Sequence, residues 1–531
     1  DGIPYEVIKN LTPQWEHYLL NIFNVILNSE QIPKKWSEII LTLLYKKGRK
    51  NDPNNYRGIA LFNTTCKLFT TILRERLSQW CDWNNILPKE QSGFRKGRSC
   101  MYNLFVLDSL INILSRFKKK YFFASFIDLQ KAFDNVNHHL LWHKLHSLGI
   151  SSKFIRILKN LYDSSFFKLK INNSLLASRI NVTKGVLQGE SLSPLLFSLF
   201  LSDFVNFYYE NGLSGVRLGS DCEILCLMYA DDIVLFGDSR TDAQLKLDTL
   251  AKYCSLNDLV VNTEKSKVIV FRPSPKCKNL LPLKINNTFL EYVNKYTYLG
   301  VPFSCTGNFN NAIAYFVSNG IKASSKIKTI LIKGKVNSLE TKLKLFYSIS
   351  AATALYSAEL WSISNLNASE KVLAIFFKNL FHLPKCTPHH FIRMEMGCHS
   401  LSLSVLRRVL NWWTQLLTMS PDEYPIKCYE YLLVSLNCNR RASCSGWVYH
   451  LNNILVSLGY VGISNFSDLS IVRREYNDIL ERWANRDLSE DAYRTMNTSY
   501  NKIYIGLCAH LAMVYFMSQI CQSKSKGLLY N

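Results

Sequence analysis

Short apolar runs that stop at an acidic residue are the most distinctive pattern in this chain. Residues 224–236 read Ile-Leu-Cys-Leu-Met-Tyr-Ala-Asp-Asp-Ile-Val-Leu-Phe, so two apolar runs flank Asp231 and Asp232. Runs this short, rich in Ile, Val, Leu and Tyr, are typical of buried strands. The pattern therefore predicts a hairpin whose tight turn is Ala-Asp-Asp.

A second apolar run, residues 121–128, ends on Asp128. Placed beside the hairpin in one sheet, it would bring Asp128 to the same rim as Asp231. An Asp pair alone is most simply a solvated turn, but neighbouring carboxylates repel one another when they are desolvated. Three carboxylates at one rim can instead hold two divalent ions roughly 3.5–4 Å apart, as in phosphoryl transfer. Mg²⁺ prefers such oxygen ligands, and Mn²⁺ accepts them too.

Other periodic segments predict the elements around this centre. Helices are expected after Thr12-Pro13, at 138–148, from a Ser193 cap and Pro194 through about Tyr209, and after Ser239. Strands are expected at 36–45, from Arg57, up to Phe271 and at 296–301, with a small hairpin around Asn286-Asn287. From about residue 370 the pattern is helical and apolar.

Basic and glycine-containing loops lie between these elements. Lys46 begins a basic loop that leads to Arg57, and this loop is either a solvated turn or a contact to a triphosphate. Residues 92–98 form a glycine-spaced basic loop suited to a phosphate backbone. Gln188-Gly189 precedes the 193–209 helix, where glycine would allow close approach to a nucleotide, although a plain loop-to-helix junction explains it equally.

Charge and composition indicate a large protein with a polyanionic partner. The 531 residues are 48% hydrophobic and carry a formal net charge of +23, spread along the chain. Such a surplus favours nucleic acid, since nothing in the sequence supports a membrane. Between Glu291 and Glu340 lysines accumulate without a single carboxylate, which favours a helix along a nucleic-acid backbone. The apolar segment Ile503–Ile520 is expected to be a buried helix, because His510 and Gln519 interrupt it.

The cysteines and the chain start bear on cellular setting. The 15 cysteines are irregularly spaced and no signal peptide is expected, so reduced thiols in the cytosol or nucleus, and no secretion, are expected. Two Cys/His groups lack zinc-site spacing and are expected to be core cysteines and incidental histidines: Cys438, Cys444 and His450, and Cys386, His389 and His390. The chain opens on Asp1, so an upstream portion is expected to be missing.

Four motifs in order resemble the palm motifs of reverse transcriptases. They are Asp128 within Phe-Ile-Asp-Leu-Gln-Lys-Ala-Phe-Asp, Gln188-Gly189, Leu192-Ser193-Pro194, and Tyr229-Ala-Asp-Asp232. Flanking blocks are similar to those of retrotransposons without long terminal repeats, the LINE type: Asp1-Gly-Ile-Pro4, Tyr56-Arg57, Ser92-Gly-Phe-Arg95, Tyr298-Leu-Gly300 and Tyr356–Trp361. The resemblance covers about residues 1–400 clearly and the remainder faintly.

The resemblance implies an RNA-directed DNA polymerase that uses an RNA template, a DNA primer, deoxynucleoside triphosphates and two Mg²⁺ ions. Asp128 and Asp231 would hold both ions, with Asp232 as the supporting acid. The implied nucleotide-binding residues are Lys46, Arg57, Phe133 (which would exclude a 2′-hydroxyl), Gln188, Gly189 and Lys265, with Lys267 as a competitor to Lys265 for protonating pyrophosphate. The implied primer- and template-binding residues are Arg95, Arg98, Tyr229, Tyr298, Leu299 and Gly300.

The implied fold is α+β, a right-hand polymerase with a ferredoxin-like antiparallel palm sheet and a helical C-terminal region. Residues 1–118 would be fingers, 119–305 palm with a fingers insertion near 150–182, 306–400 a basic helical thumb, and 401–531 a helical region of unknown role. Gly58 departs from the family pattern, and Glu190 is expected to add an acid beside the nucleotide pocket. Endonuclease motifs are not visible in the sequence.

Two rival hypotheses remain open at this stage. The first is an inert, nucleic-acid-binding transposon remnant, although all three acids are present. The second is a maturase or RNA-templated RNA polymerase with the same palm, which Phe133 argues against.

Overall fold

The computed structural model describes residues 3–117, 120–171, 174–219, 222–274, 280–437, 446–463, 466 and 468–497. The chain divides into unit 1, Asp1–Gly307 with Asp422–Tyr431, and unit 2, Asn308–Pro421 with Leu432–Asn531. The expected helix at Ile503–Ile520, as well as Cys438 and Cys444, lies outside the described residues. No helix among the described residues is long and apolar enough to cross a membrane.

The centre of unit 1 is a five-stranded sheet. Its strand order is β13 (Glu291–Tyr292), β10 (Lys267–Phe271), β3 (Phe122–Asp128), β9 (Asp232–Gly237) and β8 (Cys226–Tyr229). All neighbours are antiparallel except β13, which is parallel to β10. Numbered along the chain, β3, β8, β9 and β10 stand in the order 4-1-3-2, the ferredoxin-like arrangement. The antiparallel ferredoxin-like sheet is thus confirmed.

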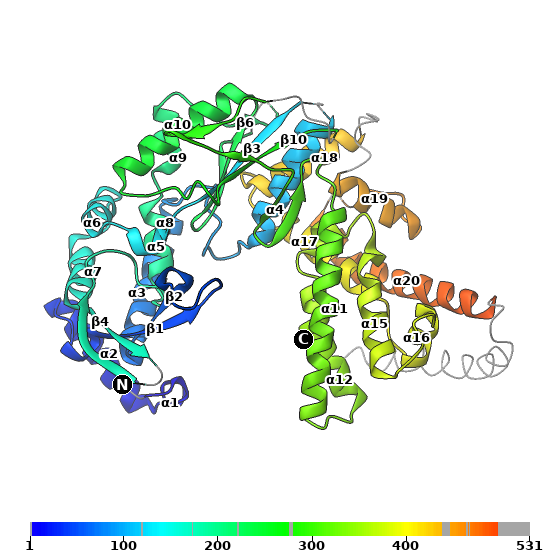
Figure 1. The fold of residues 1–531 in the computed structure, drawn as a ribbon, viewed down its shortest axis with the longest axis horizontal. Helices are drawn as coiled ribbons and strands as arrows, with labels where there is room; N and C mark the ends of the chain where they lie inside the picture. Colours follow the sequence, from blue (N-terminus) through cyan, green and yellow to red (C-terminus); the bar gives the residue numbers. More distant parts are fainter. Residues whose placement is uncertain are drawn as a thin grey trace. The chain divides into compact units, whose positions relative to one another are not determined.

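Helices cover both faces of this sheet (Figure 1). On one side lie α10 (Arg240–Leu256), which contacts β9 and β3, and α9 (Phe204–Glu210), which contacts α10. On the other side α4 (Cys100–Leu110) contacts β8, and all its residues from Met101 to Leu110 are buried. Ser239 caps α10 by accepting a hydrogen bond from the Asp242 amide at 3.1 Å, so the predicted helix start is confirmed.

The expected single helix through Tyr209 is wrong in two respects. The segment forms α8 (Ser193–Phe200) and then α9, with a break at residues 201–203. Lys144 Nζ donates to the Phe200 carbonyl at 2.8 Å and pairs with Asp203 at 2.7 Å, which stabilises the break. The cap is the Glu190 carboxylate, which accepts from the amides of Leu192 and Ser193, so Ser193 is the first helical residue.

The expected strand at 296–301 is instead a hairpin. It consists of β14 (Lys295–Tyr298) and β15 (Val301–Ser304). Leu299 at φ +44° and Gly300 at φ +82° form its turn. Positive φ at both central residues is the geometry of a tight hairpin turn. The smaller hairpin predicted around Asn286-Asn287 is confirmed as β11 (Lys284–Ile285) and β12 (Thr288–Phe289).

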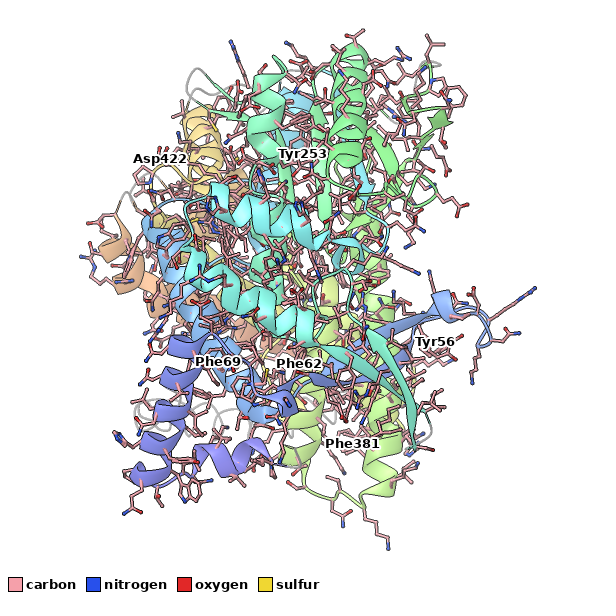
Figure 2. The ribbon with its side chains drawn as sticks, turned by 90° about the vertical axis from the view of Figure 1, so that its left-hand side faces the viewer. Tyr56, Phe62, Phe69, Tyr253, Phe381 and Asp422 are labelled. Atoms are coloured by element: carbon pink, nitrogen blue, oxygen red, sulfur yellow. The ribbon has the colours of Figure 1, made fainter. Side chains whose placement is uncertain are left out.

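A second sheet of unit 1 has the order β2 (Tyr56–Leu61), β1 (Glu38–Tyr45), β4 (Phe166–Ile171) and β5 (Ser174–Asn181). The first two strands form an antiparallel hairpin whose tip is the basic loop 46–55. Figure 2 shows Tyr56 at the root of this projecting tip. The strands expected at 36–45 and from Arg57 are confirmed.

Aromatic rings pack the helices beside this sheet together. Phe69 of α3 (Thr64–Trp83), labelled in Figure 2, packs on Phe23 of α2 (Pro13–Ser29) and on Trp36 just before β1, with ring centroids 5.4 and 5.5 Å away. The helix predicted after Thr12 is therefore confirmed as α2. Unit 1 also contains α1 (Tyr5–Lys9), α5 (Ala132–Asn135), α6 (His138–Ser147), α7 (Ser152–Ser164), β6 (Val216–Arg217) and β7 (Glu223–Ile224).

The described part of unit 2 is helical, as the pattern beyond residue 370 predicts. Its longer helices are α11 (Asn310–Lys333), α12 (Leu339–Leu345), α15 (Glu370–Leu380), α16 (His389–Met396), α17 (Leu401–Leu417), α19 (Trp447–Ser457) and α20 (Leu469–Met496). Two short helices, α13 (Ala352–Ala354) and α14 (Ala358–Trp361), lie between α12 and α15, and α18 (Tyr424–Asn437) begins in unit 1. The fingers, palm and thumb ranges stay predictions.

Candidate active site

Three carboxylates come together at one rim of the central sheet. Asp128 ends β3 and is the register partner of Asp232, the first residue of β9. Asp231 lies beside it in the turn, after Ala230 at φ +57°. The main chain of Asp128 is held on both sides, because its amide donates to Ser266 Oγ at 3.0 Å and its carbonyl accepts from the Asn262 amide at 2.8 Å. The juxtaposition predicted from the two apolar runs is thus present.

This rim carries more negative than positive charge. Burial above all, and then the charge of Asp128, raises the pKa of Asp231. Burial followed by the charges of Asp231 and Asp128 raises the pKa of Asp232 to about 6. Lys265 Nζ lies 3.4 Å from Asp128 Oδ2, so one ammonium group faces the carboxylates. A site that holds its acids in this way favours an added cation.

The donor set fits a metal ion that shares its ligands with a substrate. No group of three or more His, Cys, Asp or Glu side chains in the described residues is arranged to hold an ion by itself. Mg²⁺ in phosphate-transfer sites is usually held by one or two carboxylates, with waters and substrate phosphates completing the shell. Asp128 and Asp231 are suited to that role.

The turn at Ala230–Asp232 rests on Gln91 and on the start of the 92–98 loop, which the sequence predicts only as a contact to a phosphate backbone. The Ser92 amide donates a hydrogen bond to the Met228 carbonyl at 2.9 Å, and Gln91 Oε1 accepts one from the Ala230 amide at 3.0 Å. A Cβ atom at Gly93 would lie 2.4 Å from the Ala230 nitrogen. Gln91 and Gly93 therefore support the turn, a function that neither residue type reveals without the tertiary contact.

Arg95 and Arg98, predicted to contact primer or template, are engaged within the protein. Arg95 Nη1 donates to the Pro88 carbonyl at 3.1 Å. Arg98 donates to the carbonyls of Lys89 and Gln91 and pairs with Glu423 at 2.6 Å, and its side chain is only 8% exposed. The described contacts thus give both side chains a structural role, while contact with nucleic acid stays a prediction.

The Phe133 ring packs against two other aromatic rings. Its ring stacks on Phe197 with centroids 4.5 Å apart and meets the edge of Phe94 at 6.5 Å. The following residue, Asp134, accepts a 3.0 Å hydrogen bond from Gln188 Nε2. Phe133 and Gln188, far apart in the sequence, are therefore brought to one place, as predicted.

The charges of Lys46 and Arg57 act on acidic residues near Gln188 and in the Asp231 turn. Burial raises the pKa of Asp134, and the charges of Lys46 and Arg57 act against that rise. The charge of Arg57 also opposes the rise in the pKa of Asp231. Arg57 therefore lies within electrostatic range of both Asp134 and Asp231, and Lys46 within range of Asp134.

The loop at Gln188 and Gly189 is fastened to strand β2. The Ala60 amide donates to the Gln188 carbonyl at 2.7 Å. Gly189 has φ +115°, and a Cβ there would lie 2.4 Å from the Ala60 carbonyl oxygen. Only glycine fits this conformation and this approach. Glu190, expected to add an acid beside the nucleotide pocket, is instead 4% exposed and turned into the start of α8.

The geometry distinguishes the two lysines that competed for one role. Lys265 faces Asp128, with 67% of its side chain exposed. Lys267 pairs with Glu291 at 2.8 Å on the neighbouring strand. Lys265 is therefore the better placed of the two for proton transfer at the rim.

The residues predicted to hold the primer differ in accessibility. Tyr298 is 3% exposed, and its hydroxyl accepts from Asn103 Nδ2 at 3.2 Å. Asn103 also donates to the Met228 carbonyl at 3.1 Å, so it joins the two hairpins. Leu299 and Gly300 form the turn of the second hairpin, and Tyr229 ends β8. In this hairpin the turn, and not the Tyr298 ring, is presented outward.

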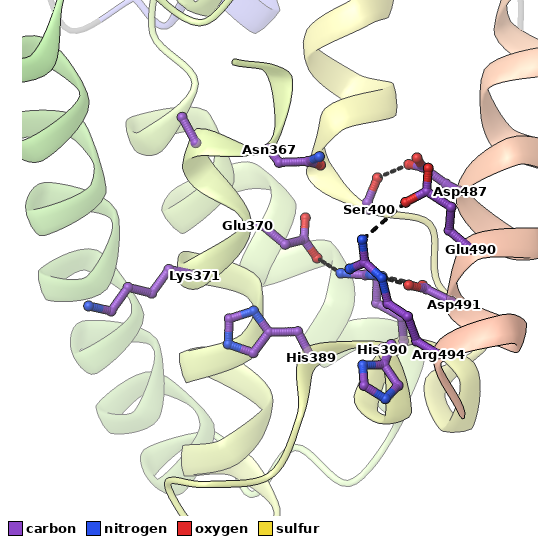
Figure 3. Close-up of a pocket in the computed structure, with 12 residues that line it drawn as sticks. Asn367, Glu370, Lys371, His389, His390, Ser400, Asp487, Glu490, Asp491 and Arg494 are labelled. Carbon is purple, nitrogen blue, oxygen red and sulfur yellow. Dashed lines mark hydrogen bonds and ion pairs between the residues drawn. The ribbon is translucent and has the colours of Figure 1, made fainter. Parts of the chain in front are cut away.

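Unit 2 contains a cavity of about 460 Å³ (Figure 3). Its acidic groups are engaged by their neighbours: Arg393 joins Glu370 and Asp491, and Asp487 accepts from Ser402 at 2.8 Å. The network ties α15, α16, α17 and α20 together. His389 and His390 line the cavity, and Cys386 is exposed, contrary to the expected core position. Within the described residues these side chains form no metal cluster.

Comparison with known proteins identifies sequences that are similar to this chain. Residues 46–303 match the family described as "Reverse transcriptase (RNA-dependent DNA polymerase)". The chain is 27% identical over 425 residues to "Probable RNA-directed DNA polymerase from transposon BS" of Drosophila melanogaster, a match covering 78% of this chain and 46% of the relative. It is 26% identical to "RNA-directed DNA polymerase from mobile element jockey" of Drosophila funebris, covering 72% and 41%.

A further relative belongs to another element. The chain is 26% identical to "Retrovirus-related Pol polyprotein from type-1 retrotransposable element R2" of Popillia japonica, covering 71% of this chain and 52% of the relative. The chain thus spans about half the length of these curated relatives.

Proposed function

Since this chain carries a reverse transcriptase domain of the kind found in retrotransposons without long terminal repeats, we propose that it is an RNA-directed DNA polymerase. It extends a DNA 3′ end with deoxynucleoside triphosphates on an RNA template. The observation that carries the proposal is the meeting of Asp128, Asp231 and Asp232 at one rim of the sheet. The proposal covers this chain alone and not the longer relatives.

Asp128 and Asp231 would hold two Mg²⁺ ions, and Asp232 would support them. When bound, the ions would activate the attacking oxygen and offset charge on the transferred phosphoryl group and the leaving oxygen. Mn²⁺ accepts the same ligands. The raised pKa values of Asp231 and Asp232 support this assignment, because carboxylates that oppose one another are held most readily around a cation.

The chain's own residues position the nucleotide and handle the leaving group. Arg57 and Lys46 bind the triphosphate, and Lys265 donates a proton to pyrophosphate as the bond between the α-phosphorus and its bridging oxygen breaks. Phosphoryl transfer needs little covalent chemistry from the protein, so positioning and charge carry most of the rate enhancement.

Phe133, Gln188 and Gly189 would form the nucleotide pocket. The Phe133 ring, fixed by Phe197, would lie under the sugar and exclude a 2′-hydroxyl. Gln188 is oriented by Asp134, and Gly189 keeps the loop against β2. Leu299, Gly300 and Tyr229 would meet the primer end, while Arg95 and Arg98 hold the loop beneath the catalytic turn.

The test is primer extension on an annealed RNA template with deoxynucleotides and Mg²⁺, at low and moderate salt. Wild-type protein should extend the primer, and Asp231→Asn should bind the duplex without extending it. Binding without extension by the wild-type protein would overturn the proposal in favour of an inert nucleic-acid-binding protein. Preferential use of ribonucleotides would favour an RNA polymerase instead.

A further inference from the structure

A segment from beyond unit 2's first helices returns to the polymerase core. Asp422–Tyr431 belongs to unit 1 although all of residues 308–421 intervene. Tyr424 and Cys428 in this segment are buried, 7% and 0% exposed. Residues 401–531 have no role in the proposed chemistry, so these core contacts require an explanation.

Glu423 makes two charged contacts from this segment. One carboxylate oxygen pairs with Arg98 at 2.6 Å, and the other accepts a hydrogen bond from the Tyr102 hydroxyl. The Arg98 guanidinium also lies over the Tyr102 ring, 4.8 Å from its centroid. Because Arg98 is nearly buried, its charge depends on Glu423 for compensation.

Tyr424 makes two further contacts to the same region. Its hydroxyl donates to Glu90 Oε1 at 2.7 Å, and Glu90 is 5% exposed. The Tyr424 amide donates to the Tyr102 hydroxyl at 3.3 Å. Two consecutive residues of the returning segment thus hold residues 90, 98 and 102.

The residues so held contact or adjoin Gln91, which supports the turn at Ala230–Asp232. Arg98 donates to the carbonyls of Lys89 and Gln91. The Glu90 carbonyl accepts from the Met228 amide at 2.9 Å, and Gln91 Oε1 accepts from the Ala230 amide at 3.0 Å. An unbroken series of hydrogen bonds therefore runs from Glu423 to the residue before Asp231.

We propose that Glu423 and Tyr424 position the catalytic hairpin, so that the chain beyond the expected thumb contributes to the polymerase site itself. Glu423 acts through Arg98, and Tyr424 acts through Glu90. Neither residue touches substrate, and the effect on rate rests on the polymerase function proposed above. A displacement of the turn by about 1 Å is enough to change such a rate by a large factor.

The variants are Glu423→Gln, which removes one hydrogen-bond acceptor and the charge, and Tyr424→Phe, which keeps the ring and removes one donor. Glu430→Gln is the matched control, since Glu430 lies in the same segment and is exposed. Three quantities are measured: the single-turnover rate, the Mg²⁺ concentration for half-maximal rate, and hydrogen exchange at the amides of Met228 and Ala230.

Glu423→Gln should lower the rate by about 10- to 100-fold, raise the Mg²⁺ requirement and speed exchange at both amides. Tyr424→Phe should do the same to a smaller degree, and Glu430→Gln should match wild type in all three. Duplex affinity should be unchanged. Wild-type exchange and Mg²⁺ dependence in both Glu423→Gln and Tyr424→Phe would overturn the inference.

The exchange measurement separates this inference from the proposed function. If wild-type protein does not extend a primer, the polymerase proposal fails, yet faster exchange at Met228 and Ala230 in Glu423→Gln would still support the positioning role. If the wild-type protein is fully active and amide exchange is unchanged in the variants, the polymerase proposal is supported and the positioning role of Glu423 is rejected.

Discussion

The Nζ atom of Lys265 lies 3.4 Å from Oδ2 of Asp128, whereas Lys267 pairs with Glu291 at 2.8 Å. The two lysines are separated by one residue, Ser266, whose hydroxyl accepts from the Asp128 amide at 3.0 Å. One segment thus fixes the main chain of Asp128 and also places an ammonium group at the catalytic rim. This placement supports the proposed proton donation from Lys265 to the leaving pyrophosphate.

Lys265→Met is therefore expected to lower kcat by about 100-fold, the lower end of the range for a general acid, with little change in the KM for nucleotide. Lys267→Met is the matched control, and it should retain nearly full kcat because it loses only a partly exposed ion pair. Steady-state extension measures both. Equal losses of kcat in the two variants would contradict the role of Lys265 as proton donor.

Gly93 has no room for a side chain, since a Cβ would lie 2.4 Å from the Ala230 nitrogen. Gly93→Ala should displace the turn and lower the extension rate by about 100-fold. Gly97→Ala, in the same loop, is the control. Gly97 has φ +77°, and a Cβ added there would meet no atom within 4 Å. This substitution should cost about 1 kcal/mol of stability through backbone strain and little activity. Comparable activity in the two variants would contradict this account.

The ring of Phe133 stacks on Phe197 at 4.5 Å, which holds it in place. Phe133→Val should lower discrimination between deoxy- and ribonucleotides by about 10-fold or more, because a bulky group that excludes the 2′-hydroxyl is lost. The measurement is the ratio of kcat/KM for one matched nucleotide pair. Phe94→Leu, which removes the edge contact without placing a β-branched residue at φ +59°, is the control. An unchanged ratio in Phe133→Val would contradict the pocket assignment.

Asp232 carries a pKa raised to about 6 from an ordinary value of 3.8. A carboxyl whose pKa is raised on folding favours the folded state below the unfolded pKa, and this contribution is lost as the pH rises through about 6. Without added metal, Asp232→Asn should therefore raise the melting temperature at pH 7.5 by about 1–3 °C, after allowance for solvent screening.

The same substitution should change the melting temperature much less at pH 4.5, where Asp232 is mostly protonated. Asp238→Asn is the control, since Asp238 is an exposed carboxylate just beyond the other end of β9. Thermal melts at the two pH values check both. A stabilisation of Asp232→Asn that is equal at pH 4.5 and 7.5 would contradict the cited pKa.

The central sheet and its rim were predictable because their pattern leaves little freedom. Residues 122–128 and 226–237 are buried along most of their length, and their acids stand where the apolar runs stop. A carboxylate is costly to bury, so both runs were expected to bring their acids to the same edge of the sheet. The strand that ends at Phe271 is apolar and buried in the same way.

Elements that depend on distant partners were not predictable. The break between α8 and α9 depends on Lys144, more than fifty residues upstream of it. Glu190 was predicted to lie near the nucleotide pocket. Its capping of α8 was missed, because the capping depends on a turn that the sequence pattern does not indicate. Arg98 read as a phosphate contact, because its partner Glu423 lies hundreds of residues away. A charged residue in the sequence does not by itself indicate whether its side chain is exposed to a ligand or buried against a partner in the protein.

The central claim, that Asp128 and Asp231 carry nucleotidyl transfer, is tested most directly by single-nucleotide incorporation at saturating RNA–DNA duplex. Asp128→Asn and Asp231→Asn should each lose incorporation by at least about 1,000-fold, because each removes a carboxylate that would hold the ions offsetting charge on the reacting phosphoryl group. Duplex affinity should be retained, and Asp238→Asn should incorporate at the wild-type rate. Incorporation by Asp231→Asn within tenfold of wild type would contradict the account.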